Sequence, residues 1–128
     1  MRTRDDLEAY LSASSYRHEL VAEDTYVVSD PSSNAGHVVV HIQDGWVVFR
    51  LKVMTLSKGA KREALFEKLL TLNASDLSQL AYALMDDEVV LTSAHRLETL
   101  DLEELQGTLD EFSLVVTTHH SMLQSFSA

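Results

Sequence analysis

The chain has 128 residues, of which 45% are hydrophobic, so it is long enough for one packed domain and too apolar for disorder. It contains no cysteine, which excludes disulfides, thiol catalysis and thiolate metal sites. Its formal net charge of -10 argues against nucleic-acid binding, because such binding needs a basic face that displaces counterions from phosphates. The N-terminus lacks the apolar stretch of a secretory signal, and no apolar run is long enough to span a membrane. We therefore expect a cytoplasmic bacterial protein.

The first elements are a helix and a short β region. Thr3 is suited to cap the helix, with Asp6 in the capping-box position, and the helix should end among the serines of residues 12–15. Its inward-facing residues are Leu7, Tyr10 and Leu11. Residues 20–29 are rich in β-branched side chains and predict either one strand or two fragments. A polar loop follows over residues 31–36, which include the only proline.

The segment HVVVHIQ-DG-WVVFRLKV predicts a β-hairpin. Asp44 and Gly45 suit a type I′ turn, in which both central residues adopt positive φ. This two-residue loop sets the register and hence the two faces of the hairpin. The core face should pair Ile42 with Val47, Val40 with Phe49, and Val38 with Leu51. The opposite face should pair Gln43 with Trp46, His41 with Val48, Val39 with Arg50, and His37 with Lys52.

A second helix is expected over residues 60–72, with Asn73 as its C-terminal stop. Its apolar residues cover about half of the circumference, which is typical of a helix that packs on two surfaces. They are Leu65, Phe66, Leu69, Leu70 and Leu72. Two strands should follow over residues 80–85 and 88–94, joined at Asp86 and Asp87.

The last helix has three agreeing start signals. Asp101 is the expected N-cap, Glu104 completes a capping box, and Leu100 with Leu105 forms a hydrophobic staple. Along the helix a heptad seam continues to the end of the chain. The seam consists of Leu102, Leu105, Leu109, Phe112, Val116, His119, Leu123 and Phe126. We expect this seam to lie across the protein's own sheet; the alternative is a coiled coil with another chain. We also expect Gly107 to allow close approach of another backbone.

No set of residues has the spacing of a catalytic, metal or cofactor site. His37 and His41 share a strand face but lie about 13 Å apart along it, too far to chelate one metal. His119 and His120 are adjacent on a helix and point in different directions. The chain has no nucleophile elbow and no glycine-rich phosphate loop, and the acidic turn at residues 86–88 is best interpreted as a hydrated turn. We expect no catalytic residue, no metal, no cofactor and no small-molecule substrate; a small hydrolase or metal site using His41 or His119 is a remote alternative.

Charge is distributed unevenly along the chain. Residues 50–68 contain six basic and two acidic side chains, a local net charge of +4. Residues 76–111 contain ten acidic and one basic side chain, a local net charge of -9. Such a bipolar surface favours ordered association with protein, although two oppositely charged solvated faces are an equally simple interpretation.

Apolar side chains exceed what one small core needs. Trp46 and Val48 lie on the half-polar face of the predicted hairpin. The apolar side of the second helix is also wider than a single packing contact requires. We predict that the hairpin face binds a partner protein. Its residues are Val39, His41, Trp46, Val48 and Arg50. The alternative is that a helix of the same chain covers this face.

The segments LLTLNASDLSQLAYALMDDEVVL and ETLDLEELQGTLDEF resemble the YbjN family, which is similar in fold to the class I type III secretion chaperones of the CesT/Tir type. The resemblance covers mainly residues 38–112. The pattern consists of Leu72-Asn73, the strand around Tyr82, the acidic turn, the V-V-L strand and the L-D-x-x-E-L helix start. The chain departs from the family at residues 78–81, where a glycine often precedes the strand.

This resemblance implies a single α+β domain over residues 1–128, with the order α-β-β-β-α-β-β-α and helices packed on an antiparallel sheet. It also implies a non-enzymatic, chaperone-like homodimer that holds a client segment extended in apolar grooves. The second helix and the strand after it would form the dimer interface. Its expected residues are Leu65, Phe66, Leu69, Tyr82 and Leu84. A regulatory adaptor in a signalling or stress-response pathway is the alternative function.

Overall fold

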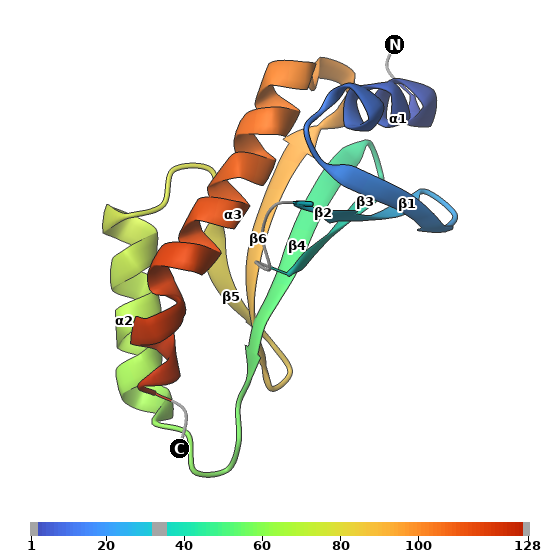
Figure 1. Ribbon diagram of the computed structural model, residues 1–128. Coiled ribbons are helices and arrows are strands. Elements are labelled where there is room, and N and C mark those ends of the chain that lie inside the picture. The colour runs from blue at the N-terminus through green and yellow to red at the C-terminus, as the bar shows by residue number, and fades with distance from the viewer. Residues whose placement is uncertain (1–2, 32–35, 127–128) are drawn as a thin grey trace.

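The computed structural model describes residues 3–31 and 36–126, and it has the α+β architecture expected from the sequence (Figure 1). The elements in chain order are α1 (Arg4–Ala13), β1 (Arg17–Ala22), β2 (Thr25–Ser29), β3 (His37–Gln43), β4 (Trp46–Thr55), α2 (Arg62–Ser75), β5 (Ala81–Met85), β6 (Glu88–Arg96), the 3-10 turn η1 (Leu97–Thr99) and α3 (Leu102–Gln124). All six strands form one antiparallel sheet in the order β1-β2-β3-β4-β6-β5.

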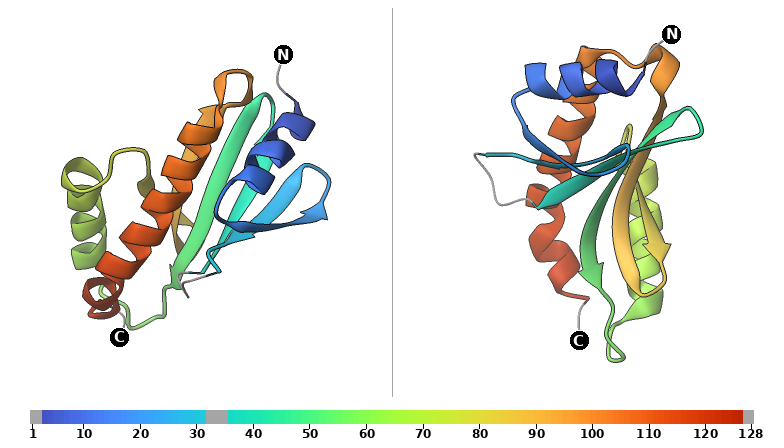
Figure 2. Two further views of the ribbon diagram at one scale, coloured as in Figure 1. Left: turned by 45° about the horizontal axis from the view of Figure 1, so that its top comes forward. Right: turned by 90° about the vertical axis from the view of Figure 1, so that its right-hand side faces the viewer.

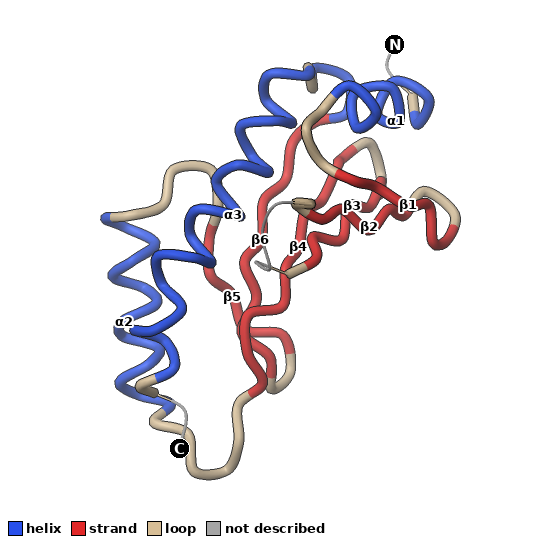
Figure 3. The backbone as a smooth tube through the Cα atoms, viewed as in Figure 1, coloured by secondary structure: helices blue, strands red, loops and turns tan. Residues whose placement is uncertain are grey.

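The helices are distributed unequally around the sheet. α3 runs diagonally across one face, and α1 crosses near the N-terminal end of α3 (Figures 1 and 2). α2 runs beside the C-terminal half of α3, next to β5 at the end of the sheet, and its two connections leave from opposite ends of the helix (Figure 3). One backbone hydrogen bond of 3.1 Å, from Lys61 N–H to the carbonyl of Phe126, joins the start of α2 to the end of the chain.

The N-terminal region confirms the expected helix and decides how many strands follow it. Thr3 and Asp6 form a complete capping box at the start of α1. The β-branched segment forms two strands, β1 and β2. The sheet therefore has one strand more than the expected order, because the sequence did not decide between one strand and two fragments here. Asp24 adopts a φ of 53° in the turn between them, which lets a two-residue connection reverse the chain. Residues 32–35 of the predicted polar loop lie outside the described residues.

The β3–β4 hairpin has the predicted turn, and its register is the predicted one over the five pairs from Val39–Arg50 to Gln43–Trp46. Asp44 and Gly45 have φ values of 52° and 83°, as a type I′ turn requires. The core face is buried: Val40, Val47 and Phe49 are each 0% exposed. Because β6 lies on the other side of β4, the register places Arg96 opposite Trp46 and Ala94 opposite Val48, as well as Thr92 opposite Arg50.

The structure corrects the expected limits of the second helix. α2 begins at Arg62 and continues past Asn73 to Ser75, so the prediction that Asn73 ends the helix was wrong. The physical reason is that the Asn73 side chain hydrogen-bonds the backbone of Tyr82 on β5 instead of capping its own helix. The following hairpin turns where predicted, with Asp86 at a φ of 55°.

α3 lies on the sheet of its own chain, as predicted. Asp101 and Glu104 form its capping box, with the Glu104 N–H 2.7 Å from Asp101 Oδ1. Phe112 packs on Phe49 of β4 with ring centroids 6.4 Å apart. The other buried seam residues are Leu105, Leu109, His119 and Leu123. The expectation for Gly107 was wrong, because a Cβ built there meets no atom within 4 Å.

Candidate functional site

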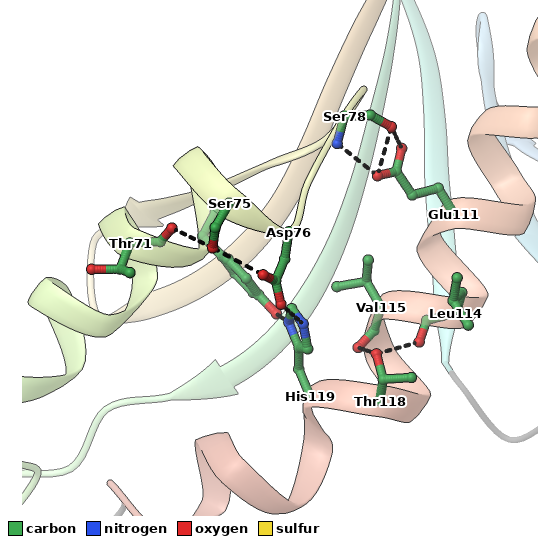
Figure 4. Close-up of polar contacts among 10 residues, drawn as sticks. Thr71, Ser75, Asp76, Ser78, Glu111, Leu114, Val115, Thr118 and His119 are labelled. Atoms are coloured by element: carbon green, nitrogen blue, oxygen red, sulfur yellow. Dashed lines mark hydrogen bonds and ion pairs between the residues drawn. The ribbon is translucent and has the colours of Figure 1, made fainter.

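A polar cluster joins α2, β5 and α3 (Figure 4). His119 of α3 is 8% exposed; its Nδ1 lies 2.7 Å from the Tyr82 hydroxyl and its Nε2 lies 3.3 Å from Asp76 Oδ2. Burial raises the pKa of the Tyr82 phenol above its ordinary value, and the negative charge of Asp76 raises this pKa further. The phenol therefore stays neutral well above neutral pH. The cluster ties the end of α2 and the middle of β5 to α3.

A second contact fixes the α2–β5 connection on the same helix. The Glu111 carboxylate accepts hydrogen bonds from the N–H groups of Ser78 and Gln79, each at 3.0 Å, and from the Ser78 hydroxyl (Figure 4). Together with the His119 cluster, this contact holds α2 and β5 as one unit against α3. Leu65 and Leu72 of this unit are buried in the core, whereas Leu70 and Leu84 are exposed.

An apolar groove of about 220 Å³ lies between α2 and β5. We call it the α2–β5 groove; its lining residues are Phe66, Leu69, Leu70, Asn73, Tyr82, Ala83 and Leu84. Four of the five residues expected at a dimer interface line it. The fifth, Leu65, is 0% exposed inside the chain's own core and offers no surface to a partner. The most exposed lining residue is Leu70, at 69%. It was among the predicted apolar residues of the helix but not among the residues predicted for the dimer interface.

The groove ends at the open edge of β5. Asn73 Oδ1 accepts the Tyr82 N–H at 2.7 Å, and Asn73 Nδ2 donates to the Tyr82 carbonyl at 3.2 Å. Both backbone groups of Tyr82 therefore point away from β6. Because this direction alternates along an antiparallel strand, the N–H and C=O of Leu84 also point to the open edge. The groove thus combines aliphatic side chains with backbone groups that another strand can pair.

The hairpin residues expected to bind a partner lie together on the other face of the sheet. We call this surface the outer face; it is formed by Val39, His41, Trp46, Val48 and Arg50, and the strand register places them on one side. Val39 and Trp46 are each 40% exposed, so no helix of the described chain buries them. The alternative that a helix covers this face is wrong.

Arg96 completes the outer face from β6. Its guanidinium carbon lies 4.9 Å from the centroid of the Trp46 ring, a cation–π contact. Sequence reasoning missed Arg96 because only the pairing of β4 with β6 brings it opposite Trp46.

Two ion pairs modify the expected charge polarity. Lys52 Nζ lies 2.8 Å from Glu88 Oε2, and Arg62 lies 3.2 Å from Asp87 Oδ1. The acidic turn therefore neutralises part of the basic stretch within the same chain. Among the described residues, the other cations of this stretch form no ion pair; they are Arg50, Lys58, Lys61 and Lys68.

The two histidines considered for a catalytic or metal site, His41 and His119, both contact hydroxyl groups of their own chain. His41 Nδ1 lies 2.8 Å from the Thr25 hydroxyl, and His119 is held in the cluster described above. Within residues 3–31 and 36–126, no group of three or more His, Asp and Glu side chains is placed to hold a metal ion. The helices in these ranges also include none with the length and apolarity of a membrane span.

The arrangement of α1, α2 and α3 on a six-stranded antiparallel sheet is that of a small chaperone-like α+β protein. The chain belongs to the CesT_Tir_1 family, whose profile matches residues 1–128. It is similar in structure to YbjN from E. coli, described as a candidate transcription regulator, with a TM-score of 0.67 and 14% identity over 95% of this chain and 96% of that one. It is also similar to the SpcU chain of the heterodimeric ExoU–SpcU complex from the type III secretion system of Pseudomonas aeruginosa. That likeness has a TM-score of 0.60 and 16% identity over 94% of this chain and 97% of that one. No curated protein matches the sequence.

Proposed function

We propose that this protein is a non-enzymatic, chaperone-like module that acts in the bacterial cytoplasm as a homodimer and binds a partner protein. The observation that carries the proposal is the presence of two separate apolar surfaces that the described part of the chain does not cover. Leu70 and Leu84 in the α2–β5 groove are 69% and 47% exposed, and Trp46 on the outer face is 40% exposed. Exposed apolar clusters of this kind mark interaction sites in small proteins.

We assign the α2–β5 groove to the homodimer. A twofold axis brings the same surface of both copies together, so a strand edge meets its own counterpart. The free N–H and C=O of Leu84 then pair across the axis, and Phe66 and Leu70 bury against the partner's copy of the groove. Leu65 supports this surface from beneath, in the core of its own chain.

We assign the outer face to the partner protein. The face lies on a different side of the sheet from α1 and α3, so it stays open when the groove is occupied. The similar SpcU chain comes from a heterodimeric complex with a second protein, which supports a protein partner for this family member as well.

The dimer is tested by the molar mass of the full chain in solution. Light scattering at micromolar concentration should give twice the 14.3 kDa of one chain. A monomer mass at this concentration would contradict the homodimer. It would not affect the proposal that the outer face binds a partner protein.

Partner binding is tested by affinity purification from native lysate with the wild type and with Trp46→Ala. We expect the variant to lose a protein that the wild type retains reproducibly. Leu114→Ala is the matched control, because Leu114 is 63% exposed on α3 outside both surfaces. Equal recovery with wild type and a folded Trp46→Ala variant would show that the outer face is not the binding surface.

The second candidate function is a regulatory adaptor that docks on one folded protein. The likeness of the fold to YbjN, described as a candidate transcription regulator, favours it. The two functions differ in the state of the partner. Capture of an isolated, unfolded segment of that partner indicates a chaperone, whereas capture of the folded partner alone indicates an adaptor.

A further inference from the structure

The outer face carries positive charge in a protein whose formal net charge is -10. The strand register extends this face from β4 onto β1, β2, β3 and β6. Alternation along the strands places eight charged or titratable side chains of β1, β3, β4 and β6 on it. They are Arg17, Glu19, His37, His41, Arg50, Lys52, Glu88 and Arg96. Cations therefore dominate on this side of the sheet, although acidic residues dominate in the whole chain.

Three of the four cations on this face have no ion-pair partner among residues 3–31 and 36–126. Lys52 pairs with Glu88. Among the described residues, no carboxylate forms an ion pair with Arg17, Arg50 or Arg96. Arg50 is exposed at the centre of the sheet, and Arg96 is held in position by the Trp46 ring. Two guanidinium groups on one face of a sheet are suited to carboxylates, which they bind through paired N–H donors.

Apolar side chains lie between these two arginines. On β4, Trp46 and Val48 precede Arg50 on the same face, and Val39 of β3 lies opposite Arg50. An extended peptide presents every second side chain to such a surface, because successive side chains point to opposite sides. Among these surface-directed side chains, valine-like residues can contact the strip between the arginines while carboxylates on either side of them reach the arginines themselves.

Building on the proposed function, we propose that the outer face binds an extended protein segment whose side chains on one side, at every second position, are apolar residues flanked by acidic ones. The apolar strip and the flanking arginines each match one part of this pattern. A nucleic acid fits the face less well, because the net charge of -10 repels a phosphate chain and the strip offers aliphatic groups more than stacking platforms. A segment rich in lysine is disfavoured by like-charge repulsion at Arg50 and Arg96.

The test uses the full chain and fluorescein-labelled synthetic peptides of about ten residues, a length that crosses the width of several strands. All three peptides carry serine at every second position. At the remaining positions they carry valines flanked by glutamate in the first peptide, by lysine in the second and by glutamine in the third. A labelled single-stranded DNA serves as a fourth probe. Fluorescence anisotropy at low and at high salt gives the affinity of each probe.

We expect the glutamate peptide to bind most tightly and its affinity to fall with salt, because charge screening weakens exposed pairs. Arg50→Gln and Arg96→Gln should each weaken its binding about threefold to fivefold, as expected for the loss of one exposed charge pair. Lys58→Gln is the matched control, since Lys58 is an exposed cation between β4 and α2, away from this face. That variant should bind the glutamate peptide like the wild type.

Three results would overturn the inference. They are equal affinity for the glutamate and lysine peptides, tighter binding of the DNA probe, and an equal loss of affinity in Lys58→Gln and Arg50→Gln. None of these results affects the proposed function itself. If a native partner is lost with Trp46→Ala while the peptides fail to discriminate, the surface is correct and only the chemistry assigned to its partner is wrong.

Discussion

The α2–β5 groove and the outer face are both apolar and open, yet they differ in what else they offer. The groove adds an open strand edge, with the N–H and C=O of Leu84 available for pairing. The outer face adds cations, with Arg96 stacked on Trp46 and Arg50 two residues beyond Val48. The groove therefore selects its partner by backbone geometry and shape, and the outer face selects its partner by charge.

The difference shows how one small domain can keep two interactions separate. Strand pairing between identical edges is satisfied by a second copy of the chain, and its strength depends little on salt. A cationic strip does not attract a copy of itself, because like charges would face each other. Self-association is thereby directed to the groove and away from the outer face.

The largest effect should come from a residue beneath the groove. Leu65→Ala is expected to reduce the free energy of unfolding by about 2–5 kcal/mol, because it opens a cavity at a side chain that is 0% exposed. Leu70→Ala on the same helix is the control and should change stability by less than about 0.5 kcal/mol. Urea unfolding checks both. Similar losses in the two variants would contradict the division of α2 into a core side and a groove side.

An intermediate effect is expected at the residue that closes part of the strand edge. Asn73→Ala removes both hydrogen bonds to the Tyr82 backbone and should cost about 1–3 kcal/mol in unfolding free energy. Asn73→Asp retains an acceptor for the Tyr82 N–H and should lose less. Hydrogen exchange at the Tyr82 amide should accelerate in the alanine variant more than in the aspartate variant. Unchanged exchange in both would show that Asn73 does not protect the edge.

A smaller effect distinguishes self-association from stability. Leu70→Ser should raise the dissociation constant of the homodimer about tenfold, which corresponds to about 1.4 kcal/mol of lost apolar burial. Sedimentation measures the change, and the unfolding midpoint of the diluted chain should stay near that of the wild type. Trp46→Ser is the control, because it alters the outer face and should leave the dimer intact. If Trp46→Ser weakens the dimer and Leu70→Ser does not, the two surfaces have been assigned the wrong way round.

The smallest effect concerns alkaline pH. The pKa of Tyr82 is higher in the folded chain than in the unfolded one, so the stability that the neutral phenol contributes is present below the unfolded pKa of about 10 and is lost at higher pH. Tyr82→Phe should therefore be less stable than the wild type at pH 8, and the gap should narrow by up to about 1.4 kcal/mol for each pH unit above 10. Urea unfolding at several alkaline pH values checks this. A gap that stays constant would mean that the phenol is not shielded beneath the groove.

Several parts of the fold were readable from short sequence motifs. The capping boxes at Thr3 and Asp101 and the turn at Asp44-Gly45 each satisfy their hydrogen bonds or backbone angles within a few residues. The register of β3 with β4 followed from the length of that turn. The α+β class followed from the order of these elements and from the family resemblance, and the family match over residues 1–128 agrees with it.

Other parts depended on distant contacts. An asparagine near the end of a helical pattern is equally suited to stop the helix or to continue it, and Asn73 continues it because Tyr82 lies within reach. A helix that is apolar over half its circumference does not reveal which side is covered, so Leu65 and Leu70 could not be separated by periodicity. Gly107 has no close neighbour in the fold, and nothing in the structure explains its choice.

The sequence by itself determined the capped starts of α1 and α3, the β3–β4 and β5–β6 hairpins and the face on which Trp46, Val48 and Arg50 lie. These features depend on capping, turn geometry and side-chain alternation over a few residues. Only the tertiary structure decided that α2 lies beside β5, that Asn73 occupies part of the strand edge, and that Arg96 joins Trp46. These features arise where segments far apart in the chain meet. Their energies depend on which side chains the packing leaves uncovered, and that information is not contained in any single segment.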